Sequence, residues 1–309
     1  LDRGRVAALL AAHAHLQARL GGPAPLDAHL DHAPHAALVD GLEGGDAGQG
    51  QIDILRILYK YRFSSRQLLA DSLHIAAGSN LYEKLNVLMR HKLVARRYNA
   101  RLKLQGIPAA YYLTPKGFKT LQTIDSRQCI TDRTIRSSYR DKIVGQAFIN
   151  HTLAVHKYTN TLTHKHPTLR TFLRRDMSRY DYFPNNPPDA FLSLKIGEEA
   201  TPRRFFFDFI SETTPRAAIN HRIAQYIKFF DEGGWNETNS ELPKLLFLVE
   251  TIAIKKRLLK AARTIRNQFD MEDDIEVYVT TANDIEHADA SRIWISIDGP
   301  DSTLSLDDL

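Results

Sequence analysis

Positive charge is concentrated in one stretch of the chain. Between Gln51 and Arg140 there are 17 basic and five acidic residues, so this stretch has a net charge of +12. The 50 residues before it carry −3, and the residues after Arg140 carry −4. A local positive field attracts a polyanion because phosphates bound by cations release their counterions. The distribution therefore favours a nucleic acid as the partner of this stretch.

Composition narrows the class of protein further. With 309 residues, of which 43% are hydrophobic and 25% charged, the chain is long enough for one or two cores. Its single cysteine, Cys129, argues against an internal disulfide and a Cys-rich zinc site, which fits a reducing cytoplasm. No apolar run approaches the roughly 20 residues that span a bilayer. We expect a cytoplasmic protein without membrane contacts.

The first 50 residues differ in composition from the rest. They contain no lysine, and apolar residues at helical spacing precede a Gly-Gly-Pro stop at 21–23. A second helix can run from about Asp27 to Leu42, followed by a Gly-rich linker. The three histidines at 29, 32 and 35 suggest a metal site, but Pro34 breaks their helical register. We therefore interpret 1–50 as a helical hairpin for packing or self-association, and we predict no metal.

The next segment, 51–125, has the pattern of a winged helix-turn-helix. A first helix carries an apolar face at 52–58, a second is capped by Ser64, and a third is capped by Ser79. Strands at 93–98 and 109–113 flank a basic turn and form a hairpin, the wing. Thr114 and Pro115 then open another helix. In this arrangement the third helix enters the major groove of DNA.

The outward residues of the third helix and the cations of the wing are the candidate DNA contacts. The helix residues would read base edges, and the wing cations would reach phosphates or the minor groove. The candidates are Ser79, Asn80, Tyr82, Lys84, Asn86, Arg90, Arg96, Arg97, Arg101 and Lys103. Winged helices also serve as protein-interaction modules, but such a module does not need an excess of twelve positive charges.

The remainder, 126–309, reads as α/β. We expect a long helix over about 139–164 with Ile143, Ala147, His151, Leu153 and Tyr158 facing inward or into an interface. Periodicity then predicts strands at 169–174, 190–195 and 204–210, a helix at 216–230, a strand at 244–249, a helix at 253–269, a strand at 275–281 and a last strand at 292–297. The predicted fold class is α+β: an N-terminal helical segment, a winged helix-turn-helix, and a mixed α/β nuclease-like domain.

Short motifs in this order resemble the replication-relaxation family of plasmids and other mobile elements. They are the run from Ile54 to Phe63, the run from Tyr111 to Gly117, His151 to Val155, Pro188-Asp189-Ala190, Phe205 to Asp208, and Arg222 to Tyr226. The resemblance covers about 51–297. It implies a DNA-binding protein linked to plasmid replication, copy control or transfer, with a C-terminal domain similar to restriction endonucleases.

The resemblance raises the question of DNA cleavage. Nucleases of that fold hold Mg²⁺ with two acidic residues, and a lysine two positions after the second acid helps to activate water. Asp189 and Asp208 have a suitable separation, but Ile210 stands at the lysine position. Glu212 does not replace it, although Arg222 or Lys228 on the next helix could compensate. We expect an inactive scaffold that supports dimerisation or partner binding.

Two further patterns bear on partners. Six basic residues between Lys255 and Arg266 lie on one predicted helix and form either a second phosphate-contacting surface or a solvated face. No Walker or Gly-rich dinucleotide motif is present, so we expect no nucleotide cofactor.

These observations predict a sequence-specific binder of double-stranded DNA that regulates transcription, replication or copy number of a plasmid or mobile element. We expect a homodimer without enzymatic activity and with no cofactor, which can also contact a protein of the replication or transfer machinery. The alternative is a nuclease or nickase that uses Asp189, Asp208 and Glu212 with Mg²⁺. A third possibility is an adaptor that uses both regions for protein contacts.

Overall fold

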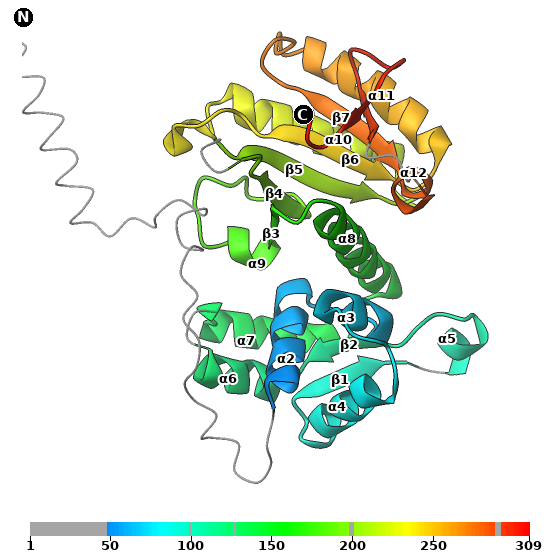
Figure 1. Cartoon of the computed structure of the whole chain (residues 1–309). Helices are drawn as coiled ribbons and strands as arrows, with labels where there is room; N and C mark the ends of the chain where they lie inside the picture. Colours follow the sequence, from blue (N-terminus) through cyan, green and yellow to red (C-terminus); the bar gives the residue numbers. More distant parts are fainter. Residues whose placement is uncertain (1–47, 99, 126–127, 198–200, 288–291) are drawn as a thin grey trace, which may run out of the picture. The chain divides into compact units, whose positions relative to one another are not determined.

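The structure is a computed structural model that describes residues 48–98, 100–125, 128–197, 201–287 and 292–309 (Figure 1). The expected helical hairpin within 1–50, with its three histidines, lies outside the described residues apart from 48–50. All described residues belong to one compact unit, 38–309. The secondary structure is mixed α+β, which confirms the predicted fold class.

The first region contains three helices, a hairpin and a closing helix. These elements are α2 (Gln49–Tyr61), α3 (Arg66–Leu73), α4 (Ser79–Arg90), β1 (Val94–Arg97), α5 (Ala100–Leu104), β2 (Ala110–Leu113) and α6 (Pro115–Ile124). Strands β1 and β2 are antiparallel, and Ser64 adds a β-bridge to Tyr111. Buried Leu58, Leu69 and Leu85 come from the three helices and join one core. This is the topology of a winged helix-turn-helix.

The structure corrects two predicted helix caps. Ser65, not Ser64, caps α3, because its Oγ accepts a hydrogen bond from the Leu68 N–H at 3.2 Å. The backbone of Ser64 is instead paired with Tyr111 in the bridge. At α4, the N-cap residue is Gly78 and Ser79 is the first residue of the helix. No side chain caps the start of α4. Ser64 and Ser65 carry the same hydroxyl, and the pairing of Ser64 with Tyr111 leaves Ser65 at the cap position of α3.

The hairpin is fastened to α6 at its base. Thr114 caps α6 by accepting from the Gly117 N–H at 3.1 Å, and its hydroxyl donates to the Lys92 carbonyl at 2.6 Å. Gly117 is required here because a β-carbon would collide with the Leu93 carbonyl. The predicted basic turn between the strands also contains a helix, α5. This helix has only five residues, which is too short for a periodic apolar pattern to appear in the sequence.

The second region is a seven-stranded mixed sheet covered by helices. Its elements are α7 (Asp132–Ser138), η3 (Tyr139–Lys142), α8 (Gln146–Lys165), β3 (Leu169–Leu173), α9 (Arg174–Met177), β4 (Ala190–Leu194), β5 (Arg203–Ile210), α10 (Arg216–Asp231), η4 (Asn236–Thr238), β6 (Lys244–Val249), α11 (Ile252–Asn267), β7 (Val277–Thr281), α12 (Ala282–His287), β8 (Arg292–Ser296) and β9 (Thr303–Ser305). The strands lie in sequence order from β3 to β9, and β5, β6 and β7 are parallel to one another. The other pairings are antiparallel.

Side chains of β5 alternate between the two faces of the sheet. Phe205, Phe207 and Phe209 share a core with residues of α8. Phe206 points to the other face, where it contacts Tyr226 of α10 at a centroid distance of 5.4 Å. Because successive residues of a strand point to opposite faces, Asp208 lies on the α10 side with Phe206.

Several predicted boundaries in this region were wrong. The expected helix over 139–164 is divided, because η3 ends at Lys142 and α8 starts after Gly145. Of the residues expected to face inward or into an interface, Tyr158 is buried, whereas Ile143, which is 78% exposed, and Ala147 lie at the surface. The strand at 292–296 is followed by β9 and is not the last one.

A buried polar junction joins α2 and α3 to α8. The Tyr61 ring stacks on His156 with centroids 3.5 Å apart, and His156 Nε2 lies 2.8 Å from the Ser72 hydroxyl. Asn160 donates to the same hydroxyl at 2.7 Å. Burial lowers the pKa of His156 to about 3, so the ring is neutral at physiological pH. We call these four residues the α8 junction.

Arg175 of α9 makes a second connection. It donates to the Tyr59 carbonyl, and its guanidinium lies 5.1 Å from the Tyr59 ring centroid and 4.9 Å from that of Phe118. The winged-helix elements therefore contact both α8, which precedes β3, and α9, which follows it. In the described part of the chain, no helix has the length and apolarity needed to cross a membrane.

Candidate nucleic-acid interface and buried aspartate cluster

Helix α4 presents a polar face away from the core. Leu81, Leu85 and Leu88 are buried at spacings of four and three residues, which directs the opposite face outward. The predicted contacts differ in exposure along this helix. Ser79, Asn80, Tyr82 and Arg90 are exposed, Asn86 and Lys84 are half-buried. Lys84 lies on the flank of the helix, with its ammonium beside Gly50 at the start of α2.

The predicted wing cations divide into two groups. Arg97 is half-buried and donates to the Lys142 carbonyl at 2.8 Å, so it holds the wing against the segment before α8. Arg96 is exposed, with its guanidinium 5.9 Å from the Tyr98 ring centroid. Arg101 and Lys103 are exposed on α5. Arg97 is therefore engaged within the protein, whereas Arg96, Arg101 and Lys103 are exposed to solvent.

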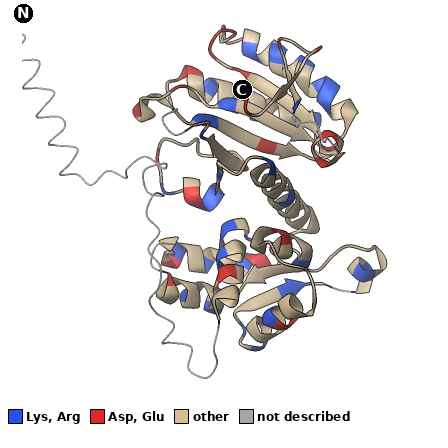
Figure 2. Ribbon diagram, in the orientation of Figure 1, with Lys and Arg blue, Asp and Glu red and all other residues tan. Residues whose placement is uncertain are grey.

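Cations occur along α3, α4, the wing and α6 (Figure 2). Within 51–125, Arg56 pairs with Asp53 and Asp125, and Arg62 pairs with Asp141. Eight others are exposed and form no ion pair with a described residue: Arg66, Arg90, Lys92, Arg96, Arg101, Lys103, Lys116 and Lys119. The positive charge of this region therefore remains available to an anionic partner.

The basic run on α11 is less available. Arg266 is 3% exposed and forms a bidentate pair with Asp298 at 2.6 and 2.8 Å. Lys255 pairs with Asp284 at 3.2 Å, and Arg263 donates to the Ile297 carbonyl. Half of the run is thus bound within the second region, which leaves Lys256, Arg257 and Lys260 exposed on α11.

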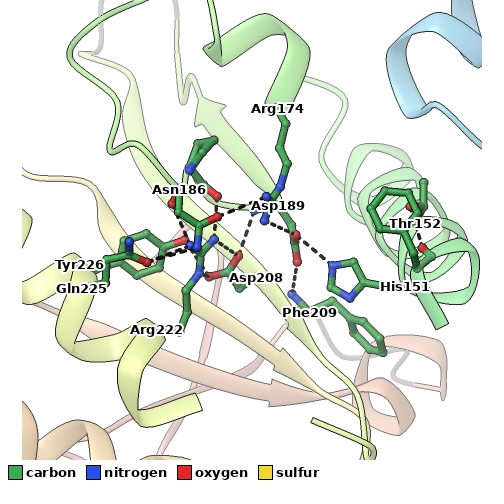
Figure 3. Close-up of polar contacts among 12 residues, drawn as sticks. His151, Thr152, Arg174, Asn186, Asp189, Asp208, Phe209, Arg222, Gln225 and Tyr226 are labelled. Atoms are coloured by element: carbon green, nitrogen blue, oxygen red, sulfur yellow. Dashed lines mark hydrogen bonds and ion pairs between the residues drawn. The ribbon is translucent and has the colours of Figure 1, made fainter. Parts of the chain in front are cut away.

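Asp208 lies at the centre of a buried polar cluster (Figure 3). Its Oδ2 accepts from Arg222 Nε at 2.8 Å and from the Tyr226 hydroxyl at 2.7 Å. Its Oδ1 accepts from Arg222 Nη2 at 3.0 Å and from the Asp189 N–H at 2.9 Å. Arg222 and Tyr226 lie four residues apart on α10 and so share one helical face. Every acceptor direction of this carboxylate is therefore directed at a protein donor.

Asp189, directly before β4, has its own set of donors. Oδ1 lies 2.9 Å from His151 Nε2 of α8 and 3.2 Å from Arg174 Nη2, and Oδ2 accepts from the Phe209 N–H at 3.1 Å. Burial would raise the pKa of Asp189, but the hydrogen bond and charge of His151 and the charge of Arg174 outweigh it and lower the pKa. Conversely, burial would lower the pKa of His151, but Asp189 outweighs burial and raises it.

The cluster does not fit a divalent cation. A metal needs free carboxylate lone pairs, whereas both aspartates are already engaged by arginine, histidine, tyrosine and backbone donors. Glu212, the third predicted acid, is exposed, and its N–H donates to Glu250. The described residues include no group of three or more His, Cys, Asp or Glu that could hold a metal. Arg222 is bound to Asp208 and neutralises its charge.

Sequence reasoning found both aspartates but not all of their partners. His151 was expected to face inward or into an interface, without an assigned partner, and Arg174 and Tyr226 were not expected in the cluster. The spacing of Arg222 and Tyr226 on one predicted helix was the available signal for the α10 side. Arg174 and His151 come from separate elements, and no local pattern connects them to Asp189.

Together, these features define a winged-helix protein with exposed cations, joined to a mixed α/β region in which Asp189 and Asp208 are buried and internally paired. Residues 55–245 match the family model described as replication-relaxation, and the chain belongs to the replication-relaxation family. This membership associates it with a DNA-related function.

Other comparisons add little. No curated protein matches the sequence. Structures of Lactococcus lactis ZitR variants are similar with TM-scores of 0.24, 0.24 and 0.21 and identities of 14%, 15% and 16%. These three matches cover 52%, 50% and 38% of this chain and 95%, 97% and 80% of the respective ZitR chains.

Proposed function

We propose that the protein is a sequence-specific, non-enzymatic binder of double-stranded DNA that regulates replication, copy number or transcription of a plasmid or mobile element. In this proposal the DNA-binding domain is 51–125 and the α/β domain is 126–309. Helix α4 reads base edges in the major groove, and the wing reaches the adjacent backbone and minor groove.

One observation carries the proposal: eight exposed cations on α3, α4, the wing and α6 form no ion pair with a described residue. Phosphates would neutralise these charges and release counterions, which provides affinity that does not depend on sequence. Asn80, Tyr82 and Arg90 on the exposed face of α4 supply groups for base-edge recognition. A bidentate contact from asparagine to adenine or from arginine to guanine discriminates by about 1–3 kcal/mol.

The engaged aspartates argue against cleavage as the function. A hydrolytic site would have to break the contacts of Asp208 with Arg222 and Tyr226 before a cation could bind. We therefore expect the purified chain to leave supercoiled and linear DNA intact in Mg²⁺ and in Mn²⁺. Metal-dependent cleavage that Asp189→Ala or Asp208→Ala abolishes would make the nuclease the preferred function.

We also propose that the protein acts as a homodimer formed by the region after Thr114. One winged helix offers few base contacts, whereas a twofold pair doubles them and reads an inverted repeat. Three large apolar side chains are exposed within ten residues there: Tyr139 at 66%, Ile143 at 78% and Phe148 at 40%. Exposed apolar groups gathered in this way are typical of interaction surfaces. A protein of the replication or transfer machinery remains a further proposed partner.

The test is a selection of bound duplexes from a random-sequence library with the full chain, followed by affinity measurements on the enriched sequence. We expect enrichment of one inverted repeat, and Asn80→Ala should relax the preference at individual positions. Asn267→Ala, which changes an exposed residue of α11, is the matched control and should keep the full preference. Failure to shift any duplex would refute DNA binding. An unchanged profile for Asn80→Ala would refute the assignment of α4.

A further inference from the structure

Leu104 is the most exposed large apolar side chain in the described part of the chain. It is 88% exposed and belongs to α5, at the far end of the hairpin formed by β1 and β2 (Figure 1). Isolated exposed leucines are common on protein surfaces and need no explanation. The surroundings of Leu104 are different, because the short helix that carries it is held in place and its neighbours are cations.

Hydrogen bonds at the C-terminus of α5 hold this short helix in shape. Gly106 has φ +67°, the left-handed conformation that glycine adopts without strain. The Gly106 N–H donates to the Lys103 carbonyl at 3.1 Å, and the Ile107 N–H donates to the Leu102 carbonyl at 3.0 Å. These two bonds form a Schellman motif, which satisfies the last carbonyls of the helix. Leu102 is only 9% exposed and anchors the inner side.

The helical geometry places Leu104 at the outermost point of the tip. With 3.6 residues per turn, Leu104 lies about 200° around the helix from the buried Leu102. Arg101 and Lys103 lie on either side of it, and both are exposed. The outward face of α5 is therefore one aliphatic side chain flanked by two cations, neither of which forms an ion pair with a described residue.

We propose that Leu104 is a wedge that enters the minor groove of double-stranded DNA and separates two stacked base pairs, with Arg101 and Lys103 bound to the flanking phosphates. This inference rests on the proposed DNA-binding function. Leucine is one of the side chains that open base steps from the minor groove and kink the duplex. The groove is about 6 Å wide, so a single aliphatic side chain can enter it while the wider helix α5 stays outside.

The flanking charges favour DNA over an apolar groove of a protein partner. In such a groove, Arg101 and Lys103 would lose water without gaining opposite charges, which is unfavourable. On DNA, phosphates line both edges of the minor groove and would pair with them. The proposal also implies that the protein prefers certain base steps where Leu104 inserts, although Leu104 forms no hydrogen bonds with bases. TA and CA/TG steps are expected there, because they unstack most easily.

Ring closure of a short DNA fragment tests the wedge without knowledge of the target sequence. The probe is a mixed-sequence linear fragment of about 120 base pairs with cohesive ends, which is shorter than the DNA persistence length of about 150 base pairs and closes poorly under ligase. The full chain at low salt should increase the yield of circles. Leu104→Ala should reduce the yield to the protein-free level, while Leu104→Phe, which keeps a large apolar group, should retain it.

The controls separate bending from binding. Ile252→Ala removes another exposed aliphatic group, 63% exposed on α11, and should behave as wild type. Gel shifts on the same fragment establish equal occupancy before yields are compared. Equal ring closure by Leu104→Ala and wild type at equal occupancy would overturn the wedge, as would wild-type binding without any increase in closure, and both results leave the proposed function intact. Absence of wild-type binding would overturn both.

Discussion

At the residue scale, Asp208 occupies the sequence position of a nuclease metal ligand, but its carboxylate is bound by protein donors instead. Its side chain is 4% exposed and that of Arg222 is 11% exposed, so the two charges are buried together. Removing one member of such a pair leaves the other charge buried without a partner, which costs about 3–5 kcal/mol. The Tyr226 hydroxyl would lose its acceptor as well.

We therefore predict that Asp208→Ala lowers the free energy of unfolding by about 3–5 kcal/mol. Urea denaturation followed by circular dichroism measures the change. Glu232→Ala is the control, because Glu232 pairs with Lys228 at the surface and both side chains are more than 60% exposed. It should cost no more than about 1 kcal/mol. Equal losses for the two variants would contradict a structural role for the aspartate.

The contact between His151 and Asp189 predicts a dependence of stability on pH. The pKa of His151 is raised above 6.5, so its contribution is complete below pH 6.5 and is lost as pH rises through the raised value. The pKa of Asp189 is lowered below 3.8, so its contribution is complete above pH 3.8 and is lost only in stronger acid. Both contributions are therefore present between these two values.

His151→Ala should accordingly flatten the decrease in unfolding free energy above pH 6.5, measured by urea denaturation across the pH series. Because the His151 side chain is 36% exposed, solvent screening should keep the effect small. His221→Ala, an exposed substitution on α10, should leave the pH profile of wild type. A wild-type slope retained in His151→Ala would show that another group is responsible.

At the scale of elements, the wing separates cations that hold structure from cations that face solvent. Arg96, Arg101 and Lys103 are exposed, whereas Arg97 is bonded to the Lys142 carbonyl. Each bound phosphate contributes about −0.9 to the slope of log affinity against log salt. We predict that replacing the three exposed cations by alanine weakens binding to all duplexes and flattens this slope by about 0.9 for each phosphate that the variant no longer binds.

The charge-matched control for this triple variant lies on α11. Replacing Lys256, Arg257 and Lys260 by alanine removes the same charge from the second region, where all three side chains are exposed. It should leave the slope close to that of wild type. A slope reduced equally by both triple variants would mean that net charge, rather than the position of the wing, determines affinity.

Periodic patterns predicted most of the elements, because long buried strands and amphipathic helices repeat a local signal. The strand Lys244–Val249 matches its prediction at both ends. Short elements such as α5 and β9 have too few residues for a period to emerge. The predicted helix over 139–164 is interrupted before Gly145, the N-cap residue of α8. The apolar residues on both sides of Gly145 keep a helical spacing, so the pattern did not show the interruption. Partners brought together by the sheet, such as Arg174 and Asp189, follow from topology that no local pattern contains.

At the scale of the whole molecule, the proposed homodimer determines how DNA is read. We predict a mass of twice 35.1 kDa by light scattering at micromolar concentration. Ile143→Asp should favour the monomer, because Ile143 is 78% exposed in the segment proposed for the contact. Ile252→Asp, on α11, should remain dimeric. A wild-type monomer that also binds DNA at one protein per site would exclude the dimer.

The α8 junction limits how this protein can be divided. Tyr61 is stacked on His156, and Ser72 is bonded to both His156 and Asn160, so a fragment that ends at 125 would leave an aromatic face and a hydroxyl of the winged helix without their partners. Exchange of DNA specificity between relatives by recombination at that boundary would therefore produce mismatched hybrids. A viable crossover would have to carry α8 together with the winged helix, so under the proposed function the heritable unit of specificity is longer than the proposed DNA-binding domain.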